Sequence, residues 1–245
     1  MMKQTNTQWR LSPAAGFTLV ELMVAMTLGL VLLTGIIRIL QSNQDTYQLQ
    51  EGVGEIQENG RFVLDFLAQD MRMTGFPRES TIVTAPIIGI DGGNAANDSV
   101  TIQYESATNC FGDATNGTLT QNQYLVQNNA NGVPELQCIG SIAGAPGATA
   151  TYTLVAGVES LQILYGEDTN GNGEINLYRI ATNVADWNDV LSVRIAVLLR
   201  TADYVNAQQD DTYKLVNESP IGPYSDGLLR RSFVTTIALR NRMPF

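Results

Sequence analysis

Apolar residues are concentrated near the start of the chain. The segment Phe17–Ile37 is 21 residues long and carries a single charge, on Glu21. About 20 consecutive, mostly apolar residues are enough for a helix to cross a bilayer. The pattern therefore predicts a membrane-spanning helix over residues 17–40.

The following segment has the periodicity of an amphipathic helix. Its apolar and small residues recur at spacings of three and four, on one helix face: Val53, Ile56, Gly60, Val63, Leu64, Leu67 and Met71. The 63 residues before Pro77 contain no proline, and Gly75 followed by Pro77 is a common helix ending. We expect one long helix whose second half, residues 41–75, packs on a globular head, with a bend or local melting near Gly52 and Gly54.

Beyond residue 80 the periodicity changes to two, which is typical of half-buried strands separated by turns. The strand candidates are Ser99–Tyr104, Leu161–Tyr165, Ile175–Leu177, Leu191–Leu199 and Phe233–Leu239. We predict that the last four form an antiparallel sheet whose apolar face covers the helix. The expected fold class is α+β, with a β-rich head over residues 76–245.

Residues 106–157 differ from the rest of the head in composition. They carry only Asp113 and Glu135 as charges and are rich in Asn, Gln, Thr, Gly and Ala. We expect loops and short edge strands exposed outside the cell, with a disordered linker as the alternative.

The residues ahead of the apolar segment indicate its orientation. Residues 1–16 contain Lys3 and Arg10 and no acid, and positive charge keeps that end of a membrane helix cytoplasmic. A cleaved signal peptide is the alternative. However, no small-x-small pattern follows Ile37, and the apolar run exceeds the ~7–15 residues of a signal-peptide core. A retained anchor with an exported head is therefore favoured.

Glu21 is unusual because a carboxylate well inside a membrane helix costs about 2.5–3.5 kcal/mol on insertion scales. A positive group from another chain would offset that cost. A position close to the hydrated membrane surface is the alternative.

The sequence Gly16-Phe17-Thr18-Leu19-Val20-Glu21-Leu22-Met23-Val24-Ala25 resembles the class III signal of type IV prepilins and type II secretion pseudopilins. The resemblance implies that a prepilin peptidase removes the leader, residues 1–16, by cutting after Gly16, and then methylates Phe17. It also implies that Glu21 pairs with the N-terminal amine of a neighbouring subunit during assembly.

The last third of the chain carries a second resemblance. Val158–Tyr165, Trp187 and Val193–Leu199 are similar to the head of PilW-type minor pilins and of the related secretion pseudopilin GspJ. The ending, Arg230–Arg242, is closer to PilW. The resemblance implies a type IV pilin-like fold.

Composition excludes several classes of function. The chain has no histidine, which excludes Ser-His-Asp and Cys-His catalysis and every histidine-containing metal site. A membrane-anchored enzyme would need a carboxylate pair or a Ser-Lys pair, and no local motif for either is present, so we expect no catalytic residues. The net charge of −10 argues against nonspecific nucleic-acid binding.

Cys110 and Cys138 are the only cysteines, and both lie in the part expected to be exported. An even pair in an oxidising compartment favours a disulfide. Two unpaired thiols are the alternative.

The turn that begins at Asp168 resembles the start of a calcium loop of the D-x-[DN]-x-[DN]-G type. The candidate ligands are Asp168, Asn170, Asn172, Glu174 through its carbonyl, and Asn176 directly or through water. Position twelve is Arg179 rather than the glutamate of a complete loop, so we expect weak calcium binding at most and no required cofactor. Because Asn-Gly pairs are also common in hairpins, a plain hairpin turn is the alternative.

Together these features predict a minor pilin that joins a pilus-tip complex and primes type IV pilus assembly by subunit packing. It would reside in the inner membrane with a periplasmic head and then at the pilus tip. The expected partners are a prepilin peptidase, other minor pilins, the major pilin and a tip adhesin. The alternatives are a GspJ-like minor pseudopilin of type II secretion, and a tip adhesin that binds through residues 106–157.

Overall fold

The computed structural model describes a subset of the chain in two compact units. The described residues are 16–76, 85–93, 96–115, 119–141, 149–205, 211–216 and 219–242. The first unit ends at Thr46 and the second begins at Tyr47. The predicted leader lies outside the described residues, except for Gly16.

The helix α1 spans Leu19–Met73, so the prediction of one long N-terminal helix is confirmed. It ends because Gly75 adopts a left-handed conformation (φ +73°). The predicted local melting near Gly52 is wrong, since α1 is continuous there. Gly52 is buried, and a Cβ on it would lie 3.0 Å from Thr201 Cγ2. The glycine therefore permits close packing and does not interrupt the helix.

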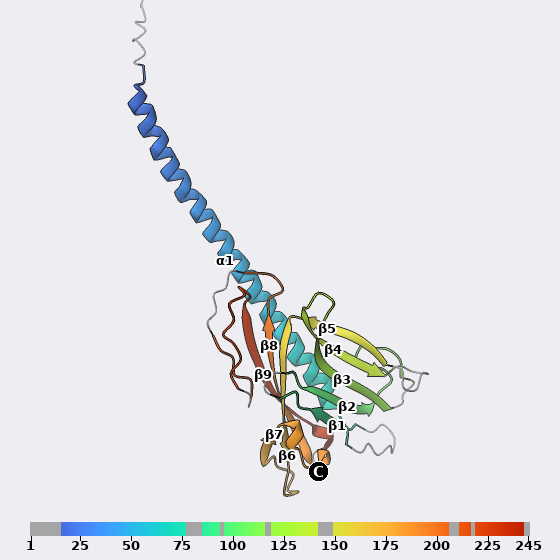
Figure 1. Cartoon of the computed structure of the whole chain (residues 1–245). Helices are drawn as coiled ribbons and strands as arrows, with labels where there is room; N and C mark the ends of the chain where they lie inside the picture. The colour runs from blue at the N-terminus through green and yellow to red at the C-terminus, as the bar shows by residue number, and fades with distance from the viewer. Residues whose placement is uncertain are drawn as a thin grey trace, which may run out of the picture. The chain divides into compact units, whose positions relative to one another are not determined.

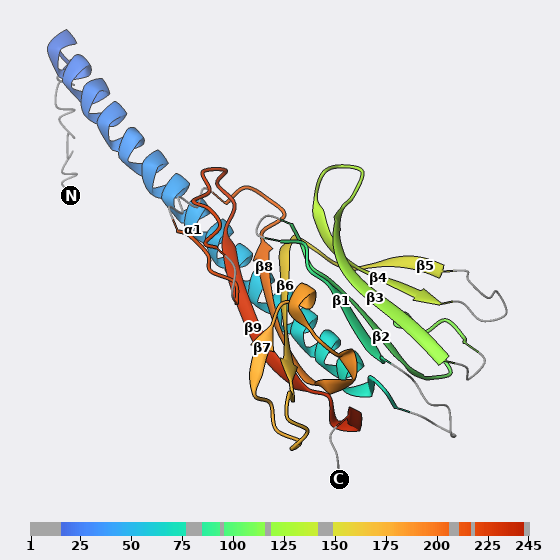
Figure 2. The same cartoon turned by 60° about the horizontal axis from the view of Figure 1, so that its bottom comes forward.

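Two antiparallel sheets make up most of the second unit (Figure 1, Figure 2). The first sheet contains, in spatial order, β1 (Ile87–Ile90), β2 (Ser99–Glu105), β3 (Leu119–Asn128), β4 (Pro134–Ser141) and β5 (Thr149–Ala156). The second contains, in spatial order, β7 (Leu177–Arg179), β6 (Val158–Glu167), β8 (Val190–Arg200) and β9 (Arg230–Ala238). The described residues also form three short 3₁₀ helices: η1 (Ala181–Asn183), η2 (Trp187–Asp189) and η3 (Arg240–Arg242).

The second sheet confirms the predicted four-stranded antiparallel arrangement, but β7 shares only Leu177 with the predicted strand Ile175–Leu177. Central strands β6 and β8 pair in the register Ile163↔Ile195, and β8 pairs with β9 in the register Ile195↔Thr235. The prediction of loops and short edge strands for residues 106–157 is wrong for β3 and β4, which are interior strands, whereas β5 is an edge strand. The alternation that marks a strand is weak in β3 because it buries two polar residues, Thr120 and Asn122.

The apolar stripe of α1 packs into one core with both sheets. Ile56, Val63, Leu67 and Met71 are almost completely buried, and Val53 and Leu64 are partly buried. The core residues from the sheets include Ile102, Tyr124, Leu136, Leu161, Ile163, Val193 and Ile195. A Cβ on Gly60 would lie 2.4 Å from Phe233 Cε2, so α1 approaches β9 at a distance that only glycine allows.

A short hydrogen-bonded seam joins the two sheets between β5 and β6. The N–H of Gly157 donates to the carbonyl of Pro134 (2.7 Å), and the Gly157 carbonyl accepts from the N–H of Arg200 (2.8 Å). Gly157 has a φ of +83°, and a Cβ there would lie 2.6 Å from the Arg200 carbonyl oxygen. Glycine is therefore required at this position, which fixes the start of β4 beside the end of β8.

Candidate functional sites on the helix and the head

The start of α1 is capped by the motif that the sequence shares with prepilins. Thr18 precedes the helix, and its Oγ1 accepts the N–H of Glu21 (3.2 Å). This is the first half of a capping box, in which the third helical residue is often glutamate. The carboxylate of Glu21 also lies in the first turn, where the helix dipole favours negative charge. The Thr-x-x-Glu spacing is the sequence signal of this cap.

Gly16 and Phe17 have no internal packing role. A Cβ on Gly16 would meet no atom within 4 Å, and Phe17 is 85% exposed. The fold therefore gives no reason for a glycine followed by a large aromatic residue.

Every described residue from Gly16 to Gln50 is exposed. The exposed side chains include most of the predicted membrane segment, for example Val20, Met26, Val31 and Leu32. Among the described helices, α1 is long and apolar enough to cross a membrane, by length and composition. Such a continuous apolar surface is stable only when lipid or another protein covers it.

The disulfide between Cys110 and Cys138 is present, with a Cα–Cα distance of 6.7 Å. It fixes the segment 106–115 against β4, where Cys138 is completely buried. The Asn109 side chain holds the same segment: its Oδ1 accepts the N–H groups of Phe111 and Asp113, and its Nδ2 donates to the Ser141 carbonyl. The segment is thus rigid on both sides of Cys110.

The turn at residues 168–176 brings the candidate calcium ligands together. Both carboxylate oxygens of Asp168 accept backbone N–H groups, which come from Asn170, Gly171, Asn172 and Gly173. Burial raises the pKa of Asp168, but these four donors outweigh it and bring the pKa below its usual value. The side-chain oxygens of Asn170 and Asn172 accept N–H groups of the same turn, and Asn176 Oδ1 accepts the N–H of Thr169.

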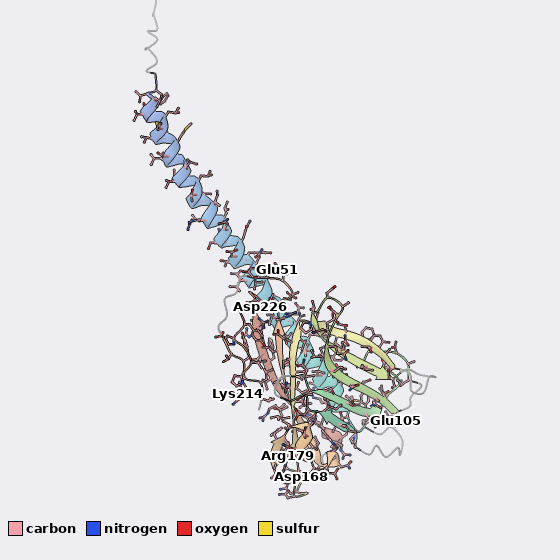
Figure 3. All side chains as sticks on the ribbon, in the orientation of Figure 1. Glu51, Glu105, Asp168, Arg179, Lys214 and Asp226 are labelled. Carbon is pink, nitrogen blue, oxygen red and sulfur yellow. A yellow bond between two sulfur atoms is a disulfide. The ribbon has the colours of Figure 1, made fainter. Side chains whose placement is uncertain are left out.

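Charged neighbours of this turn add little to a cation site. Arg179 and Asp168 lie at the same end of the head (Figure 3). Arg179 Nε is 2.9 Å from Glu167 Oε2 in an ion pair, although the two atoms are not aligned as a hydrogen bond. The described residues contain no group of three or more Asp, Glu, Cys or His side chains that could hold a metal ion. Calcium binding at this turn therefore stays a prediction.

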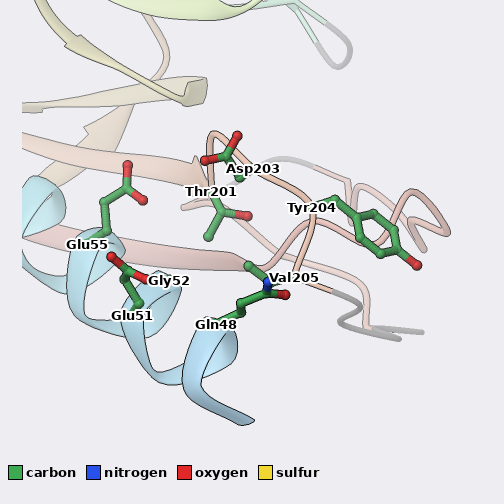
Figure 4. Close-up of a pocket in the computed structure, with 8 residues that line it drawn as sticks. All are labelled: Gln48, Glu51, Gly52, Glu55, Thr201, Asp203, Tyr204 and Val205. Carbon is green, nitrogen blue, oxygen red and sulfur yellow. The ribbon is translucent and has the colours of Figure 1, made fainter. Parts of the chain in front are cut away.

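A pocket of about 360 Å³ lies between α1 and the segment after β8 (Figure 4). Its lining includes three carboxylates, those of Glu51, Glu55 and Asp203. The Oγ1 of Thr201, which also lines it, accepts the N–H of Leu229. The lining residues include no lysine, arginine or cysteine, so the pocket offers no activated nucleophile.

Two family models match the chain, one at its N-terminal segment and one over the C-terminal part of the head. The family described as Type IV Pilus-assembly protein W matches residues 123–241, and the Prokaryotic N-terminal methylation motif matches residues 11–37. The chain is a PilW-like member of the minor pilin and pseudopilin family. PilW-like chains are structural subunits, and the apolar helix and methylation motif of this one fit membrane anchoring before assembly.

One solved structure places the PilW-like chain in the type IV pilin fold. The type IV-like pilin TTHA1219 from Thermus thermophilus matches with a TM-score of 0.52 and 14% identity, over 77% of this chain and 98% of that chain. A chain of the GspK-GspI-GspJ complex from the type 2 secretion system of enterotoxigenic Escherichia coli matches with a TM-score of 0.38 and 11% identity, over 73% of this chain and 96% of that chain. No curated protein sequence matches the chain significantly.

One polar cluster in the PilW-like head was not predicted from the sequence. Asp70 on α1 accepts hydrogen bonds from the hydroxyls of Tyr104 and Tyr124 and from Asn122 Nδ2 (3.0 Å). Burial and the Asp70 charge both raise the pKa of the two tyrosines, so their hydroxyls remain donors at neutral pH. Asn122 Oδ1 accepts the N–H of Cys110 (3.1 Å), which links the disulfide segment to the helix.

Proposed function

We propose that this chain is a minor pilin that joins a pilus-tip complex and primes assembly of a type IV pilus. The observation that carries the proposal is the prepilin-type start at Gly16, followed by a helix half whose apolar side chains have no covering within the described chain. A subunit with such a helix must exchange lipid for the helices of other subunits when it leaves the membrane. The work of the protein would then be packing.

The maturation steps follow from the same motif. A prepilin peptidase would cut after Gly16 and methylate Phe17, and the new amine would pair with Glu21 of a neighbour. This role is supported by the position of Glu21 in the first helical turn and by the exposure of Phe17. The head would remain periplasmic until assembly moves it to the pilus tip. The partners would be other minor pilins, the major pilin and a tip adhesin.

A catalytic role is disfavoured by the site chemistry. The chain has no histidine, its two cysteines are joined to each other, and the acidic pocket beside α1 lacks a nucleophile. We therefore propose that the protein is not an enzyme.

The test is deletion of the gene in the source organism, with surface pili, twitching motility and secreted enzymes measured in parallel. Loss of pili and motility that is restored by the wild-type gene supports the proposal. Loss of secretion with normal pili would instead identify a GspJ-like pseudopilin, and normal pili and secretion would contradict both assignments.

The partners are tested by solubilising the membranes and isolating the tagged full chain. Other pilin-type subunits should co-purify with it. Recovery of secretion pseudopilins alone would contradict a pilus role.

A further inference from the structure

The head contains a second pocket, which we call the seam pocket, where the β3–β4 hairpin meets the second sheet. Its volume is about 380 Å³, within the range of small-molecule sites. The lining residues used below are Val126, Gln127, Asn128, Pro134, Glu159 and Arg200. None of them belongs to the N-terminal motif, the disulfide or the calcium-like turn.

The walls of the seam pocket are held in place by hydrogen bonds. Asn97, which also lines it, donates to the Glu159 carbonyl (3.3 Å) and accepts the N–H of Leu161 (2.9 Å). Asn129 fixes the hairpin, since its Oδ1 accepts the N–H groups of Asn131 and Val133. The Pro134–Gly157–Arg200 seam joins the two walls directly. The pocket is therefore formed before any ligand arrives, which lowers the entropy cost of binding.

Arg200 has no carboxylate partner among the described residues, in contrast to Arg230 on the neighbouring strand. In the pairing of β8 with β9, Arg200 lies opposite Arg230. Arg230 is buried, and its guanidinium donates hydrogen bonds to both carboxylate oxygens of Glu159 and of Asp226. These hydrogen bonds lower the pKa of Asp226 to about 2. No described residue forms an ion pair or a side-chain hydrogen bond with Arg200. Its guanidinium therefore remains free to donate to a ligand.

The hairpin wall supplies further uncommitted polar groups. Gln127 and Asn128 are exposed, and no hydrogen bond from either side-chain amide to a described residue is present. Each amide offers a donor and an acceptor, and Arg200 offers several donors in one plane. Val126 and Pro134 add apolar surface beside them. This combination matches a ring that carries several hydroxyl groups and C–H faces.

We propose that the seam pocket binds a neutral sugar through Arg200, Gln127 and Asn128. The lining contains one carboxylate, that of Glu159, and one guanidinium, that of Arg200; Arg230, which binds Glu159, is balanced by Asp226, so the four groups together carry no net charge. The chain as a whole carries −10, which opposes the approach of anionic ligands, while Arg200 opposes cationic ones. A sugar hydroxyl both donates and accepts, and so can use the amides and the guanidinium together. This site does not depend on the proposed role in pilus assembly.

The test uses the full chain in a zwitterionic detergent that has no sugar headgroup. Saturation-transfer NMR and titration with glucose, galactose, mannose and N-acetylglucosamine should detect saturable binding of at least one of them in the millimolar range. Glucuronic acid and glucosamine serve as the anionic and cationic comparisons and should bind more weakly. Tighter binding of either charged sugar would overturn the proposal, as would the absence of saturable binding for all four neutral sugars.

Variants locate the binding on the head. Arg200→Met and Gln127→Ala should each weaken it by about tenfold or more, equivalent to about 1.4 kcal/mol. Arg231→Met is the matched control, because Arg231 is an exposed arginine on the adjacent strand and does not line the seam pocket. Unchanged binding in both pocket variants, or an equal loss in the control, would overturn the assignment.

Discussion

Gly16 is a residue whose identity the folded chain does not explain. A Cβ there meets no atom within 4 Å, and the same holds for Gly35 within α1. If Gly16 is the cleavage position, Gly16→Val should block removal of residues 1–16 while leaving the fold intact. Intact-mass analysis of membrane fractions should then find Met1, whereas Gly35→Ala should mature normally. A mature wild-type chain that begins beyond Ile37 would contradict the prepilin assignment.

Glu21 belongs to the helix-capping motif and is also the proposed partner of a neighbouring subunit's N-terminal amine, and mutation can separate these two roles. Glu21→Ala should insert into the membrane at least as well as the wild type, because it removes a carboxylate that is costly in lipid. We expect it to reduce piliation in a deletion strain, because the partner of the neighbouring N-terminal amine is lost.

Thr18→Ala is the control for this prediction. It removes the helix cap, at a cost of about 0.5–2 kcal/mol, but keeps the carboxylate. If Thr18→Ala is equally defective, capping rather than pairing explains the phenotype. Full piliation in Glu21→Ala would show that Glu21 is not an assembly contact.

Asp168 determines whether the turn at residues 168–176 binds calcium. A single carboxylate among the first three candidate ligands predicts a dissociation constant of about 10⁻⁴–10⁻³ M. Millimolar calcium should therefore raise the melting temperature of the full chain relative to chelator, since it binds only the folded state. The rise should vanish in Asp168→Ala and persist in Asp211→Ala, which removes an exposed carboxylate outside the turn. Identical wild-type melting temperatures with calcium and chelator would favour the plain hairpin.

Substitution by alanine at two glycines of α1 should change the free energy of unfolding in opposite directions. Gly60→Ala would place a Cβ 2.4 Å from Phe233, and such overpacking costs about 1–3 kcal/mol. Gly54→Ala meets no atom within 4 Å and should stabilise the helix by up to about 1 kcal/mol. Denaturant unfolding of the full chain measures both. Equal shifts in one direction would show that α1 does not approach β9 this closely.

The elements that could be predicted are those whose pattern is apolar. Strands β6, β8 and β9 carry apolar residues at alternate positions, which predicted both the strands and their sheet, although β6 and β8 are buried at almost every position. Strand β3 buries Thr120 and Asn122, whose polarity hides the alternation. Their burial becomes favourable only with partners from elsewhere in the chain, such as Asp70 for Asn122. Local periodicity carries no information about such partners.

For the whole molecule, the disulfide Cys110–Cys138 should be a main source of stability. Replacing both cysteines by serine should lower the free energy of unfolding by roughly 3–4 kcal/mol, because the unfolded chain loses a covalent loop. A reductant should lower the melting temperature of the wild type to that of the variant and leave the variant unchanged. Two free thiols in the non-reduced protein, detected by mass spectrometry, would contradict the pairing.

The candidate sites differ in how far the whole fold is needed to find them. The N-terminal motif and the calcium-like turn are contiguous, so the sequence alone predicted their residues. The Asp70 cluster and the seam pocket bring together residues from distant strands, for example Gln127 and Arg200. Such groupings depend on sheet order, which periodicity does not determine.

The hydrogen bond between Asn122 and the disulfide segment, residues 106–115, determines which side chains of that segment can change without detaching it. Asn122 accepts a backbone N–H of Cys110, and that donor is independent of the side chains around it. Phe111 is 56% exposed, and its ring stacks on that of Tyr152 with 4.1 Å between the centroids, so a substitution there would remove this ring contact but keep the hydrogen bond from Cys110 to Asn122. If the head is displayed at a pilus tip, as proposed above, exposed side chains of this segment can vary as epitopes while its backbone attachment to Asn122 is kept.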